Sequence, residues 1–476
     1  MHEPASFPLP AGARSPSRAP LVERGSWALY DFANTIFSMN VATLYFSVWL
    51  IADLGASNTV YALGNGISSL LVVVSVPVLG ALSDARRRRK PWVVGFTIAA
   101  CIACAAIGVF GQRTLPVIGE GVIGAGAPPG TWHPTIGTFG WVLFAFIVAN
   151  YCYQAAQPFY NAMLPELVPP EEQGRLSGIG TAVGYVGTIV GLLLVVPFFN
   201  GAFPLLGAIP GSILEALRSI VPFTSHAGRV STFVPTAILF FLFSLPLFLL
   251  CRDRHPRAGR VDWRQTFANV GHTLRDARDH KGALPFIAAS FLYQDAIGTI
   301  VSFMALYAVK AMGFAKGAET TLFLVLTVPA IFGSYAAGRL VDRFGPRRTL
   351  IISIVAWIAL LVAMIVVPTQ RSFWVVGGFI GLIFGAVPTA ERPMLLALVP
   401  EEEAGRFFSL MLLSSRAAAI AGPWVWAVTV DQLEPTQGTG FAYRAAVVTV
   451  ALMFAASLLL MRYVPDRRAG DAAGAA

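Results

Sequence analysis

The stretch GALSDARRRRK (residues 80–90) recurs in the second half of the chain as GRLVDRFGPRR (residues 338–348). A second pair of stretches, LVPPEEQGR (167–175) and LVPEEEAGR (398–406), is identical at seven of nine positions. A weaker match pairs Asp31, Thr35 and Ile36 with Asp295, Thr299 and Ile300. Three matches in the same order predict a duplicated unit, and duplicated membrane units commonly build transporters with a central site at their interface.

The composition indicates that lipid surrounds most of the chain. Of its 476 residues, 56% are hydrophobic and only 12% are charged, and the mean hydropathy is +0.67. Soluble domains carry about 25% charged residues. Long apolar stretches recur along the whole length, which predicts a polytopic membrane protein. The net charge of +9 is therefore not read as a sign of nucleic-acid binding.

Twelve apolar segments have the length of about 20 residues that a helix needs to cross the hydrocarbon core. The predicted fold is an all-α membrane protein with twelve transmembrane helices in two pseudo-symmetric six-helix bundles. The predicted spans are 26–50, 59–83, 91–110, 139–161, 176–199, 231–251, 284–308, 318–341, 349–368, 373–394, 407–430 and 441–463. The predicted units are a disordered cytoplasmic tail (1–25), a bundle (26–251), a cytoplasmic linker (252–283), a second bundle (284–464) and a second cytoplasmic tail (465–476).

The distribution of lysine and arginine predicts the orientation. Basic residues gather in the 86–90 turn, in the 252–281 segment and around residues 339–348, all on one side of the predicted spans. Cytoplasmic loops carry such an excess of basic residues. Both termini are therefore expected in the cytoplasm, and a multi-pass protein of a bacterial inner membrane is expected.

The repeated motif is similar to the signature of the major facilitator superfamily, in which G-x-L-x-D and a basic cluster connect helices 2 and 3 and again helices 8 and 9. Four further stretches resemble its vacuole effluxer branch, the autophagy-related and "unknown major facilitator" proteins: YDFAN (30–34), YNAMLPELVPPEEQGRLSGIG (160–180), FLYQDAIGTI (291–300) and YRAAVVTVALMFAASLLLMRY (443–463). The resemblance implies two six-helix bundles that rock around a central cavity and move a small solute. Eukaryotic relatives are associated with amino-acid efflux from the vacuole.

Polar side chains at helical spacing predict the residues that line the cavity. A polar face cannot point at lipid, so it meets another helix or water. The alternative is hydrogen bonding between helices, worth about 0.6 kcal/mol on average. The predicted substrate-binding residues are Asp31, Asn34, Asn150, Gln154, Gln157, Tyr293, Asp295 and Arg416.

The few charges inside the spans suggest the chemistry of the solute. Two acids suit an amine and Arg416 suits a carboxylate, which together favour a zwitterion such as an amino acid. If protons drive transport, then Asp31, Asp295 or Glu391 must carry them, because burial favours the protonated carboxyl. The alternative is a structural pair in which Arg416 neutralises Asp31 or Asp295.

The repeated motif also predicts gating residues. A carboxylate at the cytoplasmic end of a helix can accept from the N-terminus of a neighbouring helix and latch one conformation, while a glycine one turn earlier lets helices approach. For the arginines alone, setting the topology is a sufficient alternative. The predicted gating residues are Gly80, Asp84, Arg86, Gly338, Asp342 and Arg343.

These patterns favour a secondary active transporter that exports a small polar solute by alternating access as a monomer in the lipid bilayer, with a proton as the candidate coupling ion. The alternative is a membrane receptor or assembly partner that has kept the transporter fold. No P-loop, nucleophile–base pair or metal-ligand set is apparent, so ATP drive, an enzyme, a cofactor and a metal site are not predicted. Cys101 and Cys104 are interpreted as small residues inside a helix.

Overall fold

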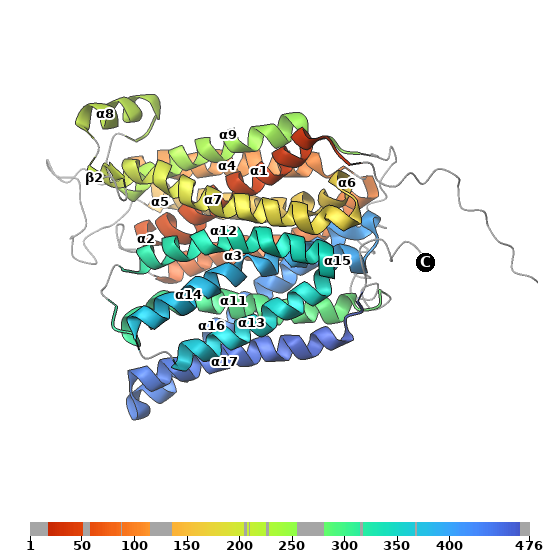
Figure 1. Cartoon of the computed structure of the whole chain (residues 1–476). Helices are drawn as coiled ribbons and strands as arrows, with labels where there is room; N and C mark the ends of the chain where they lie inside the picture. Colours follow the sequence, from red (N-terminus) through yellow and green to blue (C-terminus); the bar gives the residue numbers. More distant parts are fainter. Residues whose placement is uncertain are drawn as a thin grey trace, which may run out of the picture.

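A computed structural model describes residues 18–50, 58–86, 88–114, 136–203, 207–208, 210–224, 228–254, 280–314, 318–366 and 369–466. The predicted tails (1–25 and 465–476) and the linker (252–283) lie largely outside these residues. Within them the chain is almost entirely helical, and long helices run alongside one another (Figure 1).

The first half begins with α1 (Leu21–Phe37), which continues as the π-helical stretch η1 (Ser38–Tyr45) and the short α2 (Phe46–Val48). α1 therefore begins five residues before the start predicted for this span. The remaining elements of the half are α3 (Asn58–Arg86), α4 (Lys90–Thr114), α5 (Ile136–Ala162), α6 (Leu164–Leu167), η3 (Pro170–Glu172), α7 (Gln173–Asn200), β1 (Ala202–Phe203), β2 (Gly207–Ala208), α8 (Gly211–Ile220), η4 (Arg229–Thr232) and α9 (Phe233–Leu250). β1 and β2 pair as a small antiparallel ribbon.

The second half repeats the pattern of long helices. Its elements are α11 (Ala283–Lys310), α12 (Ala318–Phe344), α13 (Pro346–Val366), α14 (Gln370–Phe384), α15 (Ala386–Leu398), η5 (Glu401–Glu403), α16 (Ala404–Gln437), α17 (Thr439–Leu460) and η6 (Met461–Tyr463). Only Gly345 separates α12 from α13, with φ +88°, a conformation that favours glycine.

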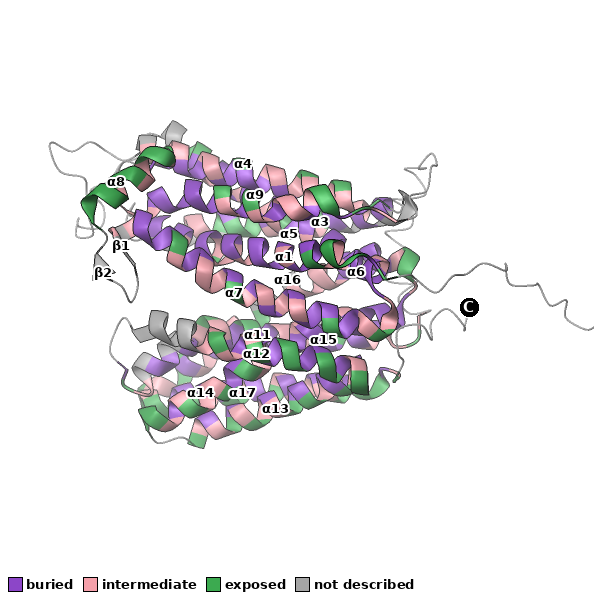
Figure 2. Ribbon diagram, turned by 45° about the horizontal axis from the view of Figure 1, so that its top comes forward, coloured by how far each residue is buried: buried purple, intermediate pink, exposed green. Residues whose placement is uncertain are grey.

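Among the described residues, eight helical segments are long and apolar enough to cross a membrane by length and composition alone. They lie in α3, α4, α7, α9, α11, α13, α14 with α15, and α17. The run α1–η1–α2 and the helices α5, α12 and α16 lie among them (Figure 1), which completes the twelve spans predicted from the sequence. Exposed apolar side chains such as Leu70, Val74 and Ile352 lie on the helices, and exposed positions mark the outer faces of α13, α14 and α17 (Figure 2).

One end of the molecule carries α6 (Figure 1), where Arg89, directly before α4, bonds to Glu166. We call this end the terminal face and the other end the opposite face. At the terminal face glycines bring helices of the two halves into backbone contact. A Cβ on Gly178 of α7 would lie 2.6 Å from the carbonyl oxygen of Ser334 of α12, and one on Gly338 would lie 2.7 Å from that of Gly174.

We call such a close backbone contact at a glycine a seam. A second seam and a polar contact complete the closure of this face. A Cβ on Gly80 of α3 would lie 2.9 Å from the carbonyl oxygen of Gly405 of α16. The backbone N–H of Arg175, in the first turn of α7, donates to the carboxylate of Asp342 at 3.0 and 3.1 Å. The first N–H groups of a helix lack partners within the helix and favour an anion, so Asp342 joins α12 to the start of α7.

We expect the variant Gly338→Val to separate α7 from α12 at the terminal face, because its side chain has no room beside the backbone of Gly174. Spin labels at the exposed positions Glu171 and Arg343 should then give a longer mean distance than in the wild-type protein, measured by double electron–electron resonance. Gly378→Val is the matched control, since nothing lies within 4 Å of a Cβ at that glycine. Equal distance distributions in the two variants would contradict the close-packing interpretation.

Candidate functional site

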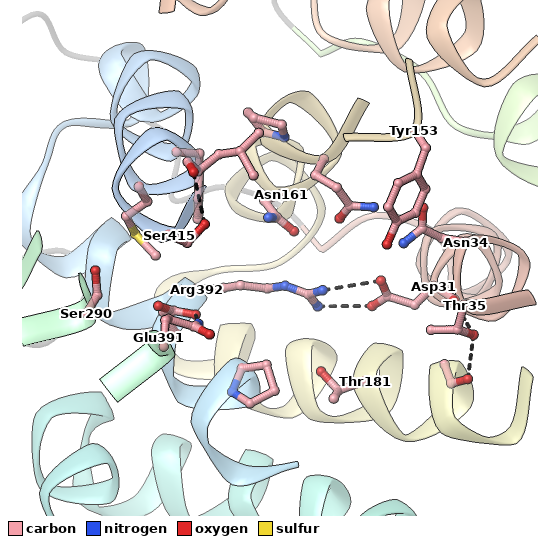
Figure 3. A pocket seen from close by; sticks show the side chains of 18 of the residues that line it. Asp31, Asn34, Thr35, Tyr153, Asn161, Thr181, Ser290, Glu391, Arg392 and Ser415 are labelled. Atoms are coloured by element: carbon pink, nitrogen blue, oxygen red, sulfur yellow. Dashed lines mark hydrogen bonds and ion pairs between the residues drawn. The ribbon is translucent and has the colours of Figure 1, made fainter. Parts of the chain in front are cut away.

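A cavity of about 430 Å³ lies between the helices of the two halves. It is lined from α1, α5 and α7 on one side and from α11, α15 and α16 on the other (Figure 3). The lining residues are Asp31, Asn34, Thr35, Tyr153, Gln157, Pro158, Asn161, Thr181, Gly184, Tyr185, Ser290, Gln294, Pro388, Glu391, Arg392, Phe408, Met411, Leu412 and Ser415. Polar groups are thus concentrated in a space that suits a small solute.

An ion pair crosses this cavity. The guanidinium of Arg392 donates from Nη1 to Asp31 Oδ2 at 3.0 Å and from Nη2 to Asp31 Oδ1 at 3.2 Å (Figure 3). The two side chains are only 13% and 7% exposed. Such a two-pronged pair fixes both the distance and the plane of the partners, so it holds α1 and α15 together across the cavity.

Two aromatic rings support the guanidinium. Its carbon lies 5.6 Å from the ring centroids of Trp27 and Tyr160, within the range of a cation–π contact. The rings stack at 4.6 Å, and each side chain donates a hydrogen bond to the backbone carbonyl of the other residue. Because these bonds fix the rings, they also restrict the position of the Arg392 guanidinium.

Glu391 adds a second carboxylate beside Arg392. It accepts hydrogen bonds from the Tyr293 hydroxyl and from the Gln294 amide, both at 2.8 Å. Glu391 is 8% exposed and lines the cavity. The cavity therefore contains two carboxylates and one described guanidinium, so its charge depends on whether Glu391 holds a proton.

Amide groups on the α1–α5 wall of the cavity are available to a solute or to water. Asn34 Oδ1, Gln157 Nε2 and Asn161 Oδ1 are buried and have no hydrogen-bond partner among the described residues. Buried polar groups in folded proteins are nearly always paired. Unpaired donors and acceptors that line a cavity therefore indicate a site for a polar ligand.

A model of the family described as "Vacuole effluxer Atg22 like" matches residues 54–474. The chain belongs to this family. It is 24% identical over 459 residues to an uncharacterized MFS-type transporter, YxiO, of Bacillus subtilis (strain 168), covering 94% of this chain and 96% of that one. It is also 26% identical over 227 residues to the multidrug resistance protein MdtG of Klebsiella pneumoniae (strain 342), a match to 46% of this chain and 53% of that protein.

Solved structures of the major facilitator superfamily have the same fold as this vacuole effluxer-like chain. The transporter FucP in the outward conformation aligns with a TM-score of 0.65 and 13% identity, covering 93% of this chain and 98% of that one. A bacterial homologue of the iron transporter ferroportin, in an outward-facing state, aligns with a TM-score of 0.61 and 13% identity, covering 91% and 98%. Together with the family model and the MFS-type relative, this fold makes the protein an integral, multi-pass transporter of the superfamily.

Of the residues predicted to bind substrate, Asp31, Asn34 and Gln157 line the cavity, as does Glu391. Asn150 instead donates to Asn65 Oδ1 and Ser68 Oγ of α3 at 3.0 and 2.7 Å, which is the interhelical alternative. Gln154, Tyr293 and Asp295 are buried and do not line the cavity. Arg416 lies in α16, but its side chain is outside the described residues.

The described partner of Asp31 is Arg392, and not the Arg416 that the sequence suggested as a partner of Asp31 or Asp295. The sequence places Arg392 at the end of a single span over residues 373–394. The structure breaks that span at Gly385, and a new helix, α15, begins at Ala386. α15 continues to Leu398, four residues beyond the predicted end of the span, so Arg392 lies within the helix and its side chain reaches Asp31 of α1.

Of the residues predicted to gate, three lie where the two halves meet at the terminal face. Gly80, Gly338 and Asp342 contact the opposite half of the molecule, as described above. The guanidinium of Arg343 lies 5.3 Å from the ring centroid of Phe344. Asp84 and Arg86 belong to α3, but their side chains are outside the described residues.

The sequence analysis missed the role of Arg89, because it treated the basic residues of 86–90 together as one indicator of orientation. Arg89 is 2% exposed. It donates to the Glu166 carboxylate at 2.8 Å and to the Glu401 carbonyl at 2.7 Å, and so joins the first half to η5 of the second. Burial raises the pKa of Glu166, while the adjacent Arg89 guanidinium opposes that shift. The echo of LVPPEEQGR at 398–406 was the available signal, since Arg89 bonds to Glu166, directly before the first copy, and to Glu401 in the second.

We expect the Asp31–Arg392 pair to show strong coupling in thermal unfolding of the purified protein. Asp31→Asn and Arg392→Gln should each destabilise the fold, since each leaves one charge buried without a partner. The double variant should recover part of the loss, with a coupling energy on the order of 1–3 kcal/mol. Strictly additive effects would contradict an energetically relevant pair.

Proposed function

We propose that this protein transports a small zwitterionic solute, such as an amino acid, by alternating access. The observation that supports this most is the Asp31–Arg392 ion pair inside the cavity. A zwitterion can replace each partner of the pair: its carboxylate binds the Arg392 guanidinium in the same two-pronged manner, and its ammonium binds the Asp31 carboxylate. Electroneutrality is then kept while the ion pair opens, so no charge is left buried alone.

The remaining lining residues suit the rest of such a solute. The amides of Asn34, Gln157 and Asn161 supply unpaired hydrogen-bonding groups, and Pro388, Phe408 and Met411 supply apolar contacts. A mixed lining of this kind accepts a small side chain with or without a polar end. It does not by itself select one amino acid, and we propose the zwitterion as the class.

Alternating access follows from the position of the pair. Asp31 belongs to the predicted unit 26–251 and Arg392 to the predicted unit 284–464, which we propose as the two moving halves. A second cavity of about 300 Å³ shares Thr35 and Tyr185 with the first and extends to Thr43 and Leu44, toward the opposite face. With the terminal face closed by glycine seams, we propose that this conformation receives solute from the opposite face.

Charge supports the proposed orientation. Described basic residues such as Arg88, Lys90 and Arg348 lie at the terminal face, which we therefore assign to the cytoplasm of a bacterial cell. Export is proposed because the family that the chain matches is described as effluxers.

We further propose that Glu391 carries a coupling proton. Its neighbour Arg392 exchanges the Asp31 carboxylate for the solute carboxylate, and while the pair opens the guanidinium favours the charged form of the adjacent Glu391. Proton and solute binding are thereby linked through one side chain.

For the solute, we expect Arg392→Lys and Asp31→Asn to reduce counterflow of radiolabelled amino acids in proteoliposomes by at least about tenfold, since a two-pronged charged bond is lost in each. Arg348→Ala is the control, because Arg348 is exposed and pairs with Asp466 far from the cavity. Wild-type counterflow by both cavity variants would rule out this solute class. Absence of any flux in the folded wild-type protein would favour a receptor role.

For the proton, Glu391→Gln should abolish accumulation driven by a pH gradient but leave exchange of solute at equal pH on both sides. The amide keeps the shape of the side chain and cannot take up a proton. The exposed Glu171→Gln serves as the control. Gradient-driven accumulation that survives in Glu391→Gln would assign the coupling elsewhere.

A further inference from the structure

The duplicated unit places the same pair of side chains against a glycine twice. On α1, Asp31 and Thr35 face glycines of α7, and a Cβ on Gly180 would lie 2.7 Å from Asp31 Oδ2. On α11, Asp295 and Thr299 face Gly422 of α16, where a Cβ would lie 2.7 Å from Asp295 Oδ1 and would collide with Thr299 Oγ1. A carboxylate and a hydroxyl one helical turn apart thus converge on a bare stretch of neighbouring helix in both halves.

In the first half these groups are satisfied. The carboxylate of Asp31 receives both prongs of the Arg392 guanidinium. The hydroxyl of Thr35 donates to the carbonyl of Gly184 at 2.6 Å. The carboxylate is therefore neutralised by a positive charge, and the hydroxyl has a hydrogen-bond acceptor.

In the second half no described side chain pairs with the corresponding carboxylate and hydroxyl. Asp295 is 1% exposed and Thr299 is fully buried. No described side chain bonds to the Asp295 carboxylate or to the Thr299 hydroxyl, and the backbone N–H of Gly422 is the one described group that faces the carboxylate. An isolated buried carboxylate is costly, so it needs either a proton or a cation.

The neighbouring helix offers a further oxygen at this level. Pro423 lies inside α16 and has no N–H. The carbonyl of residue 419 therefore lacks the donor that a regular helix would supply, and residue 419 precedes Gly422 by three positions, the spacing of neighbours on one face of a helix. Freed carbonyls of interrupted helices coordinate Na⁺ in other transporters.

We propose that Asp295, Thr299 and the carbonyl of residue 419 form a Na⁺ site between α11 and α16. All of its donors are oxygens, which suit a hard cation, and its single carboxylate balances a single positive charge. A proton would occupy only one carboxylate oxygen, whereas an ion serves several oxygens at once. Na⁺ here takes the place that the Arg392 guanidinium takes in the first half. The site is separate from the solute cavity, which neither Asp295 nor Thr299 lines.

The test is Na⁺ binding to the purified full-length protein without solute, so its outcome does not depend on the proposed transport. The thermal transition should rise saturably with NaCl at constant ionic strength against choline chloride, as mass action requires. Asp295→Asn should weaken the apparent affinity at least about tenfold, because the charged ligand is lost. Thr299→Val, which keeps the shape of the side chain, should weaken it to a lesser extent.

Ser302→Ala is the matched control on the same helix. Ser302 is exposed and bonds to the Gly298 carbonyl, so its loss should leave the Na⁺ response unchanged. Titration calorimetry with NaCl provides a second measurement if Asp295→Asn folds poorly. A wild-type protein that responds equally to NaCl and choline chloride, or an Asp295→Asn protein that keeps the Na⁺ response, overturns the proposal. A transition that depends on Asp295 and on pH alone would assign the position to a proton and also overturn it.

Discussion

The bidentate bond between Asp31 and Arg392 is the interaction on which the centre of this molecule depends. Both side chains are largely buried, and either charge alone would cost several kcal/mol. Together they hold α1 of the first half against α15 of the second, at the level of the cavity. Trp27 and Tyr160 fix the guanidinium from behind. The site and the contact between the halves are therefore the same structure.

Close helix packing at the terminal face is the second constraint, and it comes from the absence of side chains. Gly174, Gly178 and Gly338 let α7 and α12 approach until backbone meets backbone. Without a hydrophobic driving force between helices in lipid, such contacts are a main source of association. Two polar contacts also join the halves at this face. Asp342 bonds to the start of α7, and Arg89 bonds to η5.

The duplication explains why two halves with similar motifs are not equivalent. Asp31 and Asp295 occupy matching positions, each beside a threonine and a glycine-bearing helix. Only the first is paired with arginine among the described residues, and it is this difference that separates a solute cavity from the proposed ion site. A repeat thus supplies one local geometry that neighbouring elements then use for two kinds of chemistry.

The sequence by itself determined the membrane class, the twelve spans, the duplication and the superfamily, because apolar length and repeated motifs are local properties of the chain. It also placed Asp31, Asn34, Gln157 and Glu391 among the candidate residues, since polar groups inside apolar spans are few. Only the tertiary structure decided which of them meet. α15 continues to Leu398, so Arg392 lies inside that helix and meets Asp31, and packing of α3 on α5 uses Asn150 for an interhelical bond. Partners of a buried charge lie hundreds of residues away in the chain, so helix packing, and not local pattern, selects them.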